Sequence, residues 1–594
     1  MNWNQELLNS ALWLGKTFAI TLVVFVIVMA ALARWTVWGR QFWSLSGAYF
    51  SPKRSWRPLL GVALMLLFTL FGVRLNVLFS FWYNDFYSAM QVLDQPKFWF
   101  SLNLFGILAT IHVVRALAGD YIRSAFTIHW RQWLNDRTVE EWLGGQSYYL
   151  GRFAKPTVDN PDQRIQQDVT TLVGTTLSLS LGLVSAVVSV YEFTGILWNL
   201  SAPMAVFGTE VPRMMVFLVY GYVLVASFFA FSIGRPLIEL NFLNEKFTAN
   251  YRYLLVRVRE YGESIALYRG ERVEQRGLLG SFADVITNAW ETLWRSLKFT
   301  GYNLVVSQIS VVFPFIIQAP RLFAGTIKLG DVIQTSQSFG QLADSLSFFR
   351  SSYDEFAGYR AVLDRLSGFE QNVAASAKLS LPVVRDNPSA FVTRHLTVNR
   401  PDGHPLLTDL NMTLAAGQAL LIRGPSGSGK TTLLRTLAGL WPFSAGESER
   451  PTGAASLFLS QRPYLPVGSL RAALAYPADT VSDEVARQVL AQVQLGQLAD
   501  QLDIEQDWSQ VLSPGEQQRL AFGRALANRP AIIFLDEATS ATDAGLEHTL
   551  YGLLRTHLPQ TILVSVGHRQ TLAAFHDQAL TFTGEGRWVL EPVN

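Results

Sequence analysis

The sequence predicts two parts of unlike fold, an all-α region of membrane-spanning helices followed by an α/β domain with a parallel sheet. Long apolar runs fill the first 352 positions of a 594-residue chain that is 49% hydrophobic and 16% charged. With 17 Trp and 39 Phe, this balance is typical of membrane proteins with aromatic belts. Further on, an apolar run at 419–422 leads through a glycine-rich loop into a helix-like segment. A five-residue apolar run at 531–535 suits a parallel strand covered on both faces.

The first apolar run, about 17–34, is expected to be a retained membrane helix. Residues 31–33, Ala-Leu-Ala, resemble a signal-peptidase site, and cleavage there is the alternative. However, only Glu6 and Lys16 are charged before the run's apolar centre, so the positive start of a signal peptide is missing. The segment 34–57 contains five basic residues and no acidic one, which predicts that this segment is cytoplasmic and the N-terminus external.

Further membrane spans are expected along the chain by length and hydropathy. They lie at about 58–82, 99–120, 171–198, 213–234, 302–325 and, more weakly, 331–352. The last one is polar, and we expect it to face an aqueous cavity, a soluble helix being the alternative. Its polar residues are Gln334, Thr335, Ser336, Gln337, Ser338 and Gln341. The charged segments 121–170 and 235–301 are expected to be long helical extensions on the cytoplasmic side.

Seven helices with an external N-terminus bring the C-terminal domain into the cytoplasm. The predicted bounds are an extra N-terminal helix with its connector at 1–57, a membrane domain at 58–368, a linker at 369–390 and the α/β domain at 391–594. Cysteine is absent, which excludes disulfides and thiolate metal sites, and the net charge of +2 gives no basic field for nucleic acid.

The glycine-rich loop fits the P-loop pattern G-x-x-x-x-G-K-[ST]. Glycines let backbone N–H groups converge on phosphates, and the helix N-terminus behind them adds partial positive charge. We expect Lys430 to reach the β- and γ-phosphates of ATP and the Thr431 hydroxyl to bind Mg²⁺. The expected nucleotide-binding residues of this loop are Gly424, Ser426, Gly427, Ser428, Gly429, Lys430, Thr431 and Thr432.

A second motif, Leu512-Ser513-Pro514-Gly515-Glu516, resembles the signature loop of the ABC ATPases. Pro514 and Glu516 depart from the commonest form, L-S-G-G-Q. In that family the loop caps the γ-phosphate bound by the opposite subunit. The resemblance therefore implies that Ser513, Gly515 and Glu516 bind nucleotide and that the chain pairs with a second copy of itself.

Other residues complete the expected ATP site. Asp536 and Glu537 end the apolar run at 531–535; Asp536 would hold Mg²⁺ and Glu537 would act as general base on the attacking water. Gln461 resembles the metal-sensing Q-loop residue, an ordinary polar loop residue being the alternative. His568, after the strand-like run 561–566, resembles the switch histidine, so Glu537 and His568 are the expected catalytic pair. Asp543 resembles the D-loop residue, although Thr542 replaces the usual leucine.

The base of the nucleotide has no obvious aromatic partner. ABC domains usually stack adenine on an aromatic residue upstream of the P-loop, but 396–403 contains none. Arg400 could stack its guanidinium plane on the base. The alternative is a solvated turn arginine with a weakened adenine contact.

More specific motifs resemble one branch of the ABC transporters. Residues 438–442 and 459–471 resemble subfamily D cassettes, and 263–268 resembles the coupling segment of that subfamily. Residues 82–91, starting Trp-Tyr-Asn-Asp, and 160–165 resemble the SbmA/BacA peptide-uptake proteins and their ABC-fused bacterial relatives. The resemblance implies an exporter-type six-helix core plus one N-terminal helix, in the bacterial inner membrane, with importing activity in studied relatives.

The resulting hypothesis is an ATP-driven homodimeric transporter that imports hydrophilic peptide-like or corrinoid-sized solutes. The alternatives are an exporter of lipid or fatty-acyl substrates and a proton-driven carrier with a regulatory cassette. A soluble ABC ATPase acting on nucleic acid is opposed by the spans and the charge. Arg74 and Glu192 lie within spans, where charges usually face a cavity or a partner. Both lie toward the outer side, so snorkelling to water stays open as well.

Overall fold

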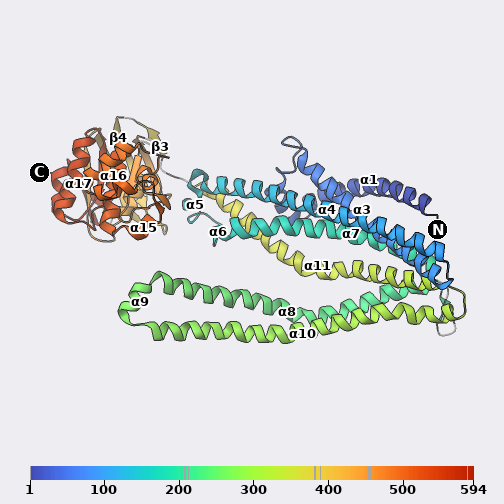
Figure 1. Cartoon of the computed structure of the whole chain (residues 1–594). Coiled ribbons are helices and arrows are strands. Elements are labelled where there is room, and N and C mark those ends of the chain that lie inside the picture. Colours follow the sequence, from blue (N-terminus) through green and yellow to red (C-terminus); the bar gives the residue numbers. More distant parts are fainter. Residues whose placement is uncertain are drawn as a thin grey trace. The chain divides into compact units, whose positions relative to one another are not determined.

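The computed structural model describes residues 2–201, 204–206, 209–211, 213–379, 381, 383–387, 389–451, 456–584 and 586–593 (Figure 1). The chain divides into two compact units. The helical unit comprises Met1–Gly145 and Val158–Asn372, and the sheet unit comprises Gln146–Thr157 and Val373–Asn594. A short segment between two membrane helices therefore belongs with the C-terminal domain.

The helical unit is built from long helices. They are α1 (Trp3–Trp35), α2 (Val37–Ser46), α3 (Arg57–Gln91), α4 (Gln95–Leu143), α7 (Val169–Leu200), α8 (Met214–Glu260), α9 (Gly262–Tyr268), α10 (Glu271–Phe323) and α11 (Leu329–Ser376). A single turn, α6 (Pro161–Gln163), and the π-helical turn Arg164–Asp168 lead into α7. Within the described residues, α1, α3, α4, α7, α8 and α10 are long and apolar enough to cross a membrane. The first six predicted spans therefore correspond to these helices. The seventh, 331–352, lies in α11, which is a helix but is not among the six.

Most of these helices are longer than a bilayer requires. The helices α4, α8 and α10 have 49, 47 and 53 residues. At 1.5 Å per residue this is about 70–80 Å, against about 30 Å of hydrocarbon. They therefore continue past the membrane, as predicted for 235–301. In 121–170 the prediction of a long helix is only partly right, because α4 ends at Leu143 and the next long helix, α7, begins only at Val169.

The first helix starts earlier than expected. It begins at Trp3, with the Asn2 side chain capping the N–H of Gln5, rather than at residue 17. These four additional turns carry side chains that bond to other helices of the unit. These contacts stabilise the helix over residues 3–16, although this segment is less apolar than the predicted span.

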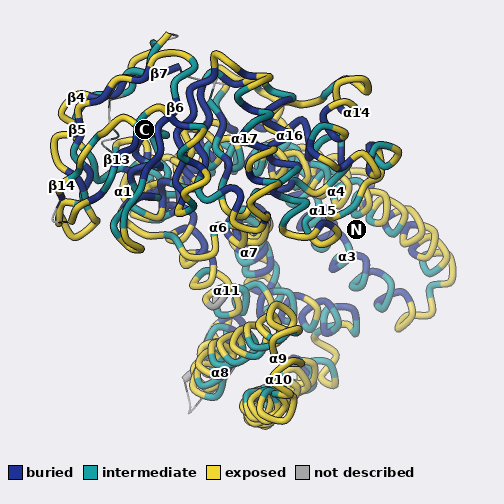
Figure 2. Tube along the Cα trace, turned by 90° about the vertical axis from the view of Figure 1, so that its left-hand side faces the viewer, coloured by how far each residue is buried: buried dark blue, intermediate teal, exposed yellow. Residues whose placement is uncertain are grey.

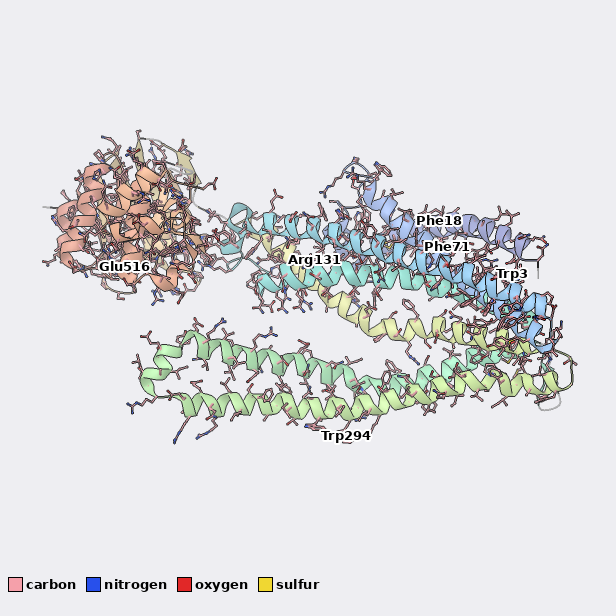
Figure 3. The ribbon with its side chains drawn as sticks, in the orientation of Figure 1. Trp3, Phe18, Phe71, Arg131, Trp294 and Glu516 are labelled. Carbon is pink, nitrogen blue, oxygen red and sulfur yellow. The ribbon has the colours of Figure 1, made fainter. Side chains whose placement is uncertain are left out.

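The hairpin of α8 and α10 differs from the other helices in its exposure. Figure 1 shows these helices side by side, joined by α9, and they contact each other along much of their length. Figure 2 shows them largely exposed. Large apolar side chains on α10, including Trp290 and Trp294, are exposed, and Figure 3 shows Trp294 pointing away from the ribbon. A contiguous exposed apolar face of this kind marks an interaction surface.

Among its described residues the sheet unit has two large sheets and a short two-stranded one, β9 (Gly468–Ser469) with β10 (Glu505–Gln506). The six-stranded sheet has the order β14-β13-β6-β12-β11-β8, in which all neighbours are parallel except β14 with β13. Its strands are β6 (Ala419–Arg423), β8 (Ser456–Leu459), β11 (Ile532–Asp536), β12 (Ile562–Val566), β13 (Gln578–Gly584) and β14 (Arg587–Pro592). The predicted strands are therefore present, and all three lie in the sheet centre.

A second sheet of four strands has the order β3-β7-β4-β5. Its strands are β3 (Val383–Asp386), β4 (Ala390–Asn399), β5 (Pro405–Ala415) and β7 (Ser444–Arg450). Apolar residues of both sheets and of α12 (Lys430–Leu437) form one core. The predicted linker 369–390 contains the last residues of α11 and the strand β3, with residues 380, 382 and 388 outside the described part.

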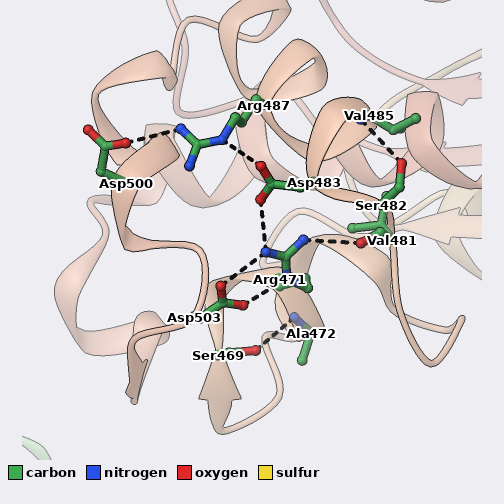
Figure 4. A network of polar contacts seen from close by, with 10 residues as sticks. All are labelled: Ser469, Arg471, Ala472, Val481, Ser482, Asp483, Val485, Arg487, Asp500 and Asp503. Atoms are coloured by element: carbon green, nitrogen blue, oxygen red, sulfur yellow. Dashed lines mark hydrogen bonds and ion pairs between the residues drawn. The ribbon is translucent and has the colours of Figure 1, made fainter.

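Helices cover the other face of the six-stranded sheet. They are α13 (Leu470–Ala475), α14 (Asp483–Gln492), α15 (Trp508–Val511), α16 (Pro514–Asn528) and α17 (Ala544–His557), and their apolar faces form the second core. On the surface, Arg471 of α13 bonds to Asp503 and Asp483, and Asp483 also pairs with Arg487 (Figure 4). Single exposed pairs contribute little, but this network orients α14 against α13.

Candidate functional site

Four loops of the candidate site lie at one edge of the six-stranded sheet. The strands β6, β12, β11 and β8 are parallel neighbours, so their carboxyl ends meet at the same edge, where ligands bind in open α/β sheets. The P-loop follows β6, His568 follows β12 and Gln461 follows β8. Asp536 ends β11, and Glu537 comes next.

The P-loop forms an open cradle of backbone. Gly424, Gly427 and Gly429 have φ of 147°, 76° and 100°, values that a side chain disfavours. Lys430 begins α12 and donates from Nζ to the carbonyls of Gly424 at 2.9 Å and Pro425 at 2.8 Å. The Ser428 hydroxyl is buried without a hydrogen-bond partner among the described residues. An unused hydroxyl and a lysine within a ring of N–H groups fit the phosphates of a nucleotide.

Two of the three expected metal ligands, Thr431 and Asp536, lie together. The Thr431 hydroxyl donates to Asp536 Oδ1 at 3.0 Å, and burial raises the pKa of Asp536. Gln461 is fixed by its carbonyl, which accepts from Gln518 Nε2 at 2.9 Å, while its side chain stays exposed. Hydroxyl, carboxylate and amide oxygens are the donors that Mg²⁺ prefers.

The expected catalytic pair is also in contact. Glu537 has a left-handed φ of 49° and donates its N–H to the Val566 carbonyl. Its carboxylate Oε1 lies 3.3 Å from His568 Nε2. The strained backbone conformation turns the Glu537 side chain away from the path of β11 and toward the end of β12.

The signature loop forms the N-terminal cap of a helix. Ser513 is the N-cap of α16, Pro514 occupies the first turn and Glu516 stands at the third position. The Glu516 carboxylate accepts from both the N–H and the hydroxyl of Ser513, at 2.9 and 2.7 Å. This is a capping box, and the bond from the Ser513 hydroxyl lowers the pKa of Glu516. An ideal Cβ on Gly515 would lie 3.2 Å from the Ala541 carbonyl, so this helix start adjoins the D-loop.

Arg400 lies in the turn between β4 and β5. Its N–H donates to the His404 carbonyl, and its side chain is exposed. Leu406, on the same hairpin, packs against Gly429 of the P-loop, so the turn adjoins the cradle. The described geometry leaves the stacking role of Arg400 a prediction.

Two buried polar residues behind the site were not predicted. Gln518 of α16 bonds to Gln461, Ser540 and the N–H of Ala541. Glu547 of α17 binds Thr539, Thr571 and Arg569. A signal for Glu547 exists in the sequence, because it occupies the apolar stripe that continues with Leu550, Tyr551 and Leu554.

The motif at 82–91 joins three other helices to α3. Trp82 Nε1 donates to the Ser101 carbonyl of α4 at 2.7 Å. The Asn84 amide donates to Asp331 and Gln334 of α11 at 2.8 and 2.7 Å. Asp85 accepts from Trp3 Nε1 of α1 at 2.9 Å and pairs with Lys97. The motif therefore holds the external ends of these helices together.

The expectation that the polar residues of α11 face an aqueous cavity is partly wrong. Gln334, Thr335 and Ser338 are buried. They bond to Asn84 and Ser80 of α3 and Gln318 of α10, so they satisfy neighbouring helices instead of water. Only Gln337 is exposed, and Ser336 and Gln341 are half-buried.

Arg74 and Glu192 do not snorkel to water. Arg74 is 8% exposed, with Nη2 2.5 Å from Glu6 Oε1 and Nη1 3.7 Å from Glu192 Oε2. Its Nε donates to the Ser10 hydroxyl, and the Trp13 indole donates to Glu192 at 2.9 Å. We call Glu6, Ser10, Trp13, Arg74 and Glu192 the outer ion cluster. It joins α1, α3 and α7, which explains why both charges are tolerated within spans.

The segment between α4 and α7 packs within the sheet unit. The Phe153 ring lies 5.3 Å from that of Trp441 and 5.7 Å from that of Phe443, just after α12. The hydroxyl of Ser376, at the end of α11, donates to Ser147 of α5 (Ser147–Leu150). The predicted contact of a cytoplasmic extension with the ATPase is thus made by 146–157. The predicted coupling segment 263–268 forms α9, with Leu267 and Tyr268 exposed.

Comparisons with known proteins agree with this geometry. The family described as ABC transporter transmembrane region 2 matches residues 45–323, and the family described as ABC transporter matches 407–540. An uncharacterized ABC transporter ATP-binding protein of Haemophilus influenzae is 50% identical over 99% of this chain and 100% of its own length.

Other relatives are more distant. The inner membrane ABC transporter ATP-binding protein YddA of Escherichia coli is 32% identical, over 88% of this chain and 93% of its own. The human lysosomal cobalamin transporter ABCD4 is 26% identical, over 78% and 81%. A solved bacterial Atm1-family ABC exporter with ATP bound has a TM-score of 0.70 at 17% identity, covering 90% of this chain and 94% of that one. This last likeness shows the shared fold.

Proposed function

The chain belongs to the ABC transporters, and we propose that it works as a homodimer that imports hydrophilic solutes of peptide or corrinoid size. It is an ATP hydrolase coupled to transport, and it uses ATP with Mg²⁺. It is a multi-pass protein of the bacterial inner membrane with its ATPase domain in the cytoplasm.

The main support for ATP-driven transport is the contact between Glu537 and His568, together with the contact between Thr431 and Asp536. In our proposal Lys430 and the P-loop N–H groups bind the phosphates, and Thr431, Asp536 and Gln461 hold Mg²⁺. The metal neutralises charge that develops on the phosphates. Glu537 takes a proton from the attacking water, and His568 orients Glu537 through the 3.3 Å contact.

A second copy is needed by this arrangement. The N-terminus of α16, with Ser513 and Gly515, is proposed to close over phosphates held by the other subunit, as the family resemblance implies. The exposed apolar face of α10, with Trp290 and Trp294, supports a partner surface of the same chain. Because the chain has no cysteine, cysteines placed at Ser426 and Ser513 should cross-link between chains when ATP is bound. Only intra-chain product, or none, would contradict the dimer.

Three observations support a hydrophilic cargo. The motifs at 82–91 and 160–165 resemble peptide-uptake proteins, and the name of one relative records cobalamin transport. The exposed Gln337 and half-buried Gln341 of α11 also leave part of one polar face free. A polar path favours solutes that keep their hydration, because stripping polar groups costs kilocalories per group.

One observation favours the second candidate, export of lipid or fatty-acyl substrates. A cavity of about 1050 Å³ lies between α1, α7 and α11. Its lining is mostly apolar and includes Ile20, Val24, Val187 and Phe356, although Lys16 and Glu192 also border it. An acyl chain would match these walls.

Uptake in cells separates the candidates. Overproduction of the wild-type protein should make cells more sensitive to peptide antibiotics with intracellular targets, and the Glu537→Gln variant should not. The exposed Glu484 on α14 provides a matched Glu484→Gln control, which should behave like wild type. Resistance instead of sensitivity, or stimulation of the reconstituted ATPase by acyl compounds alone, would favour export. Transport that persists without ATP but stops with a protonophore would favour the proton-driven carrier.

A further inference from the structure

Glu547 is a buried carboxylate that lies behind the candidate site. It stands in the first turn of α17 and is 1% exposed. None of the roles above uses it. A carboxylate removed from water in this way is costly unless charged or hydroxyl donors surround it. The groups that it binds therefore indicate what it does.

Its two oxygens connect two segments of the site. Oε2 accepts from the Thr539 hydroxyl at 2.7 Å and lies 3.4 Å from Arg569 Nη1. Oε1 accepts from the Thr571 hydroxyl at 2.6 Å. Thr539 stands two residues after Glu537, and Arg569 directly follows His568. Glu547 thus holds the chain that follows the general base against the chain that follows the histidine.

The D-loop joins the same network. Arg569 Nη2 donates to the Thr542 carbonyl at 2.9 Å. The Thr542 hydroxyl donates a hydrogen bond to the Thr539 carbonyl at 2.9 Å, and the Ser540 N–H donates to the Glu537 carbonyl at 3.0 Å. The ladder between β11 and β12 ends at Asp536 and Val566. Beyond that point these side-chain bonds join the two loops.

We propose that Glu547 is a positioning residue for ATP hydrolysis, which sets the contact between Glu537 and His568 by fastening the loops that carry them. It does not touch the nucleotide. Movement of the D-loop at Thr542 is passed through Arg569 to the neighbouring His568. The state of the D-loop therefore controls whether the general base is oriented.

The chemistry makes glutamine a poor replacement. The carboxylate faces the hydroxyls of Thr539 and Thr571 and the guanidinium of Arg569, all of which act as donors. An amide nitrogen has no acceptor capacity, so in Glu547→Gln one threonine hydroxyl must turn from donor to acceptor, and Arg569 loses the negative charge that it faces. Aspartate is one methylene shorter and cannot span both hydroxyls without moving α17.

The test is the steady-state ATPase of the full-length protein in lipid nanodiscs. Glu547→Gln should lower kcat about tenfold while KM for ATP stays within about twofold, because the P-loop contacts are untouched. Glu484→Gln, on the exposed face of α14, is the matched control and should leave both constants unchanged. Combining Glu547→Gln with Arg569→Gln should lower kcat little beyond the single change, because both remove the same link.

A purely structural role gives a different result. In that case Glu547→Gln would lower the unfolding temperature while kcat, normalised to the sites that bind a fluorescent ATP analogue, stayed at the wild-type value. That outcome would overturn the proposal, as would a rise in KM with kcat unchanged. If Glu547→Gln fails to fold, Thr571→Val supplies the test: it removes one bond and should lower normalised kcat severalfold, and an unchanged value would equally overturn it.

Discussion

Replacing Arg74 by methionine should loosen the N-terminal helix from the rest of the helical unit. Methionine is long and unbranched like arginine, but the substitution removes the single cation of the outer ion cluster. Glu6 and Glu192 then face each other without their shared partner. The Ser10 hydroxyl also loses the hydrogen bond from Arg74, and the Trp13 ring loses the guanidinium that lies over it.

The magnitude follows from burial. Breaking a buried ion pair from one side costs about 3–5 kcal/mol, because the remaining charge is left without compensation. The side chains of Arg74, Glu6 and Glu192 keep exposures of 10, 18 and 14%, so we expect the lower part of that range, about 3–4 kcal/mol. Adding Glu6→Gln and Glu192→Gln should recover part of the loss, because no unpaired charge then remains.

The assay is thermal unfolding of the detergent-solubilised protein, monitored by tryptophan fluorescence. Arg123→Met is the matched control, since its pair with Asp120 lies on the same type of long helix with exposures of 56 and 68%. Such a pair contributes less than about 1 kcal/mol. If Arg74→Met lowered the unfolding temperature no more than Arg123→Met, or if the triple variant were less stable than Arg74→Met, the reasoning about the outer ion cluster would be refuted.

Three further predictions concern the ATP site. Glu537→Gln should abolish steady ATP hydrolysis by about 10²-fold or more while ATP binding persists, and more than about a tenth of wild-type turnover would contradict its role as base. GTP hydrolysis should stay within about tenfold of ATP hydrolysis, since one missing aromatic contact near Arg400 is worth about 1 kcal/mol; a preference for ATP above about a hundredfold would show that another ring stacks on the base. Glu516→Gln should lower KM for ATP severalfold, because it removes a negative charge from the helix end proposed to meet the phosphates while glutamine keeps the capping box with Ser513; a higher KM would show that the carboxylate itself assists binding.

Local motifs made much of the fold and site predictable. The P-loop needs glycines and a lysine in fixed order between a strand and a helix, so its place after β6 could be read from 419–432 alone. The order of the sheet explains why Asp536, His568 and Gln461 gather with it, because all three follow parallel strands at one edge. Membrane spans were equally readable, since a bilayer demands about 20 apolar residues in a row.

Contacts between distant helices could not be read in the same way. The side chains of Gln334 and Ser338 are polar, but polarity alone does not tell whether water or Asn84 and Ser80 will satisfy them. Arg74 was visible as a charge within a span, yet its partner Glu6 lies 68 positions earlier on a helix whose start was itself misplaced. Only packing in three dimensions selects such partners.

The membership of 146–157 in the sheet unit has a mechanical consequence. The chain passes between the two units near residues 145, 157 and 372, so three covalent crossings link them. Three covalent crossings leave a domain less conformational freedom than a single flexible tether would, and the segment between two of them packs through Phe153 beside Trp441. The crossings adjoin three different membrane helices, so the ATPase domain is connected along the chain to α4, α7 and α11 rather than to the last helix alone.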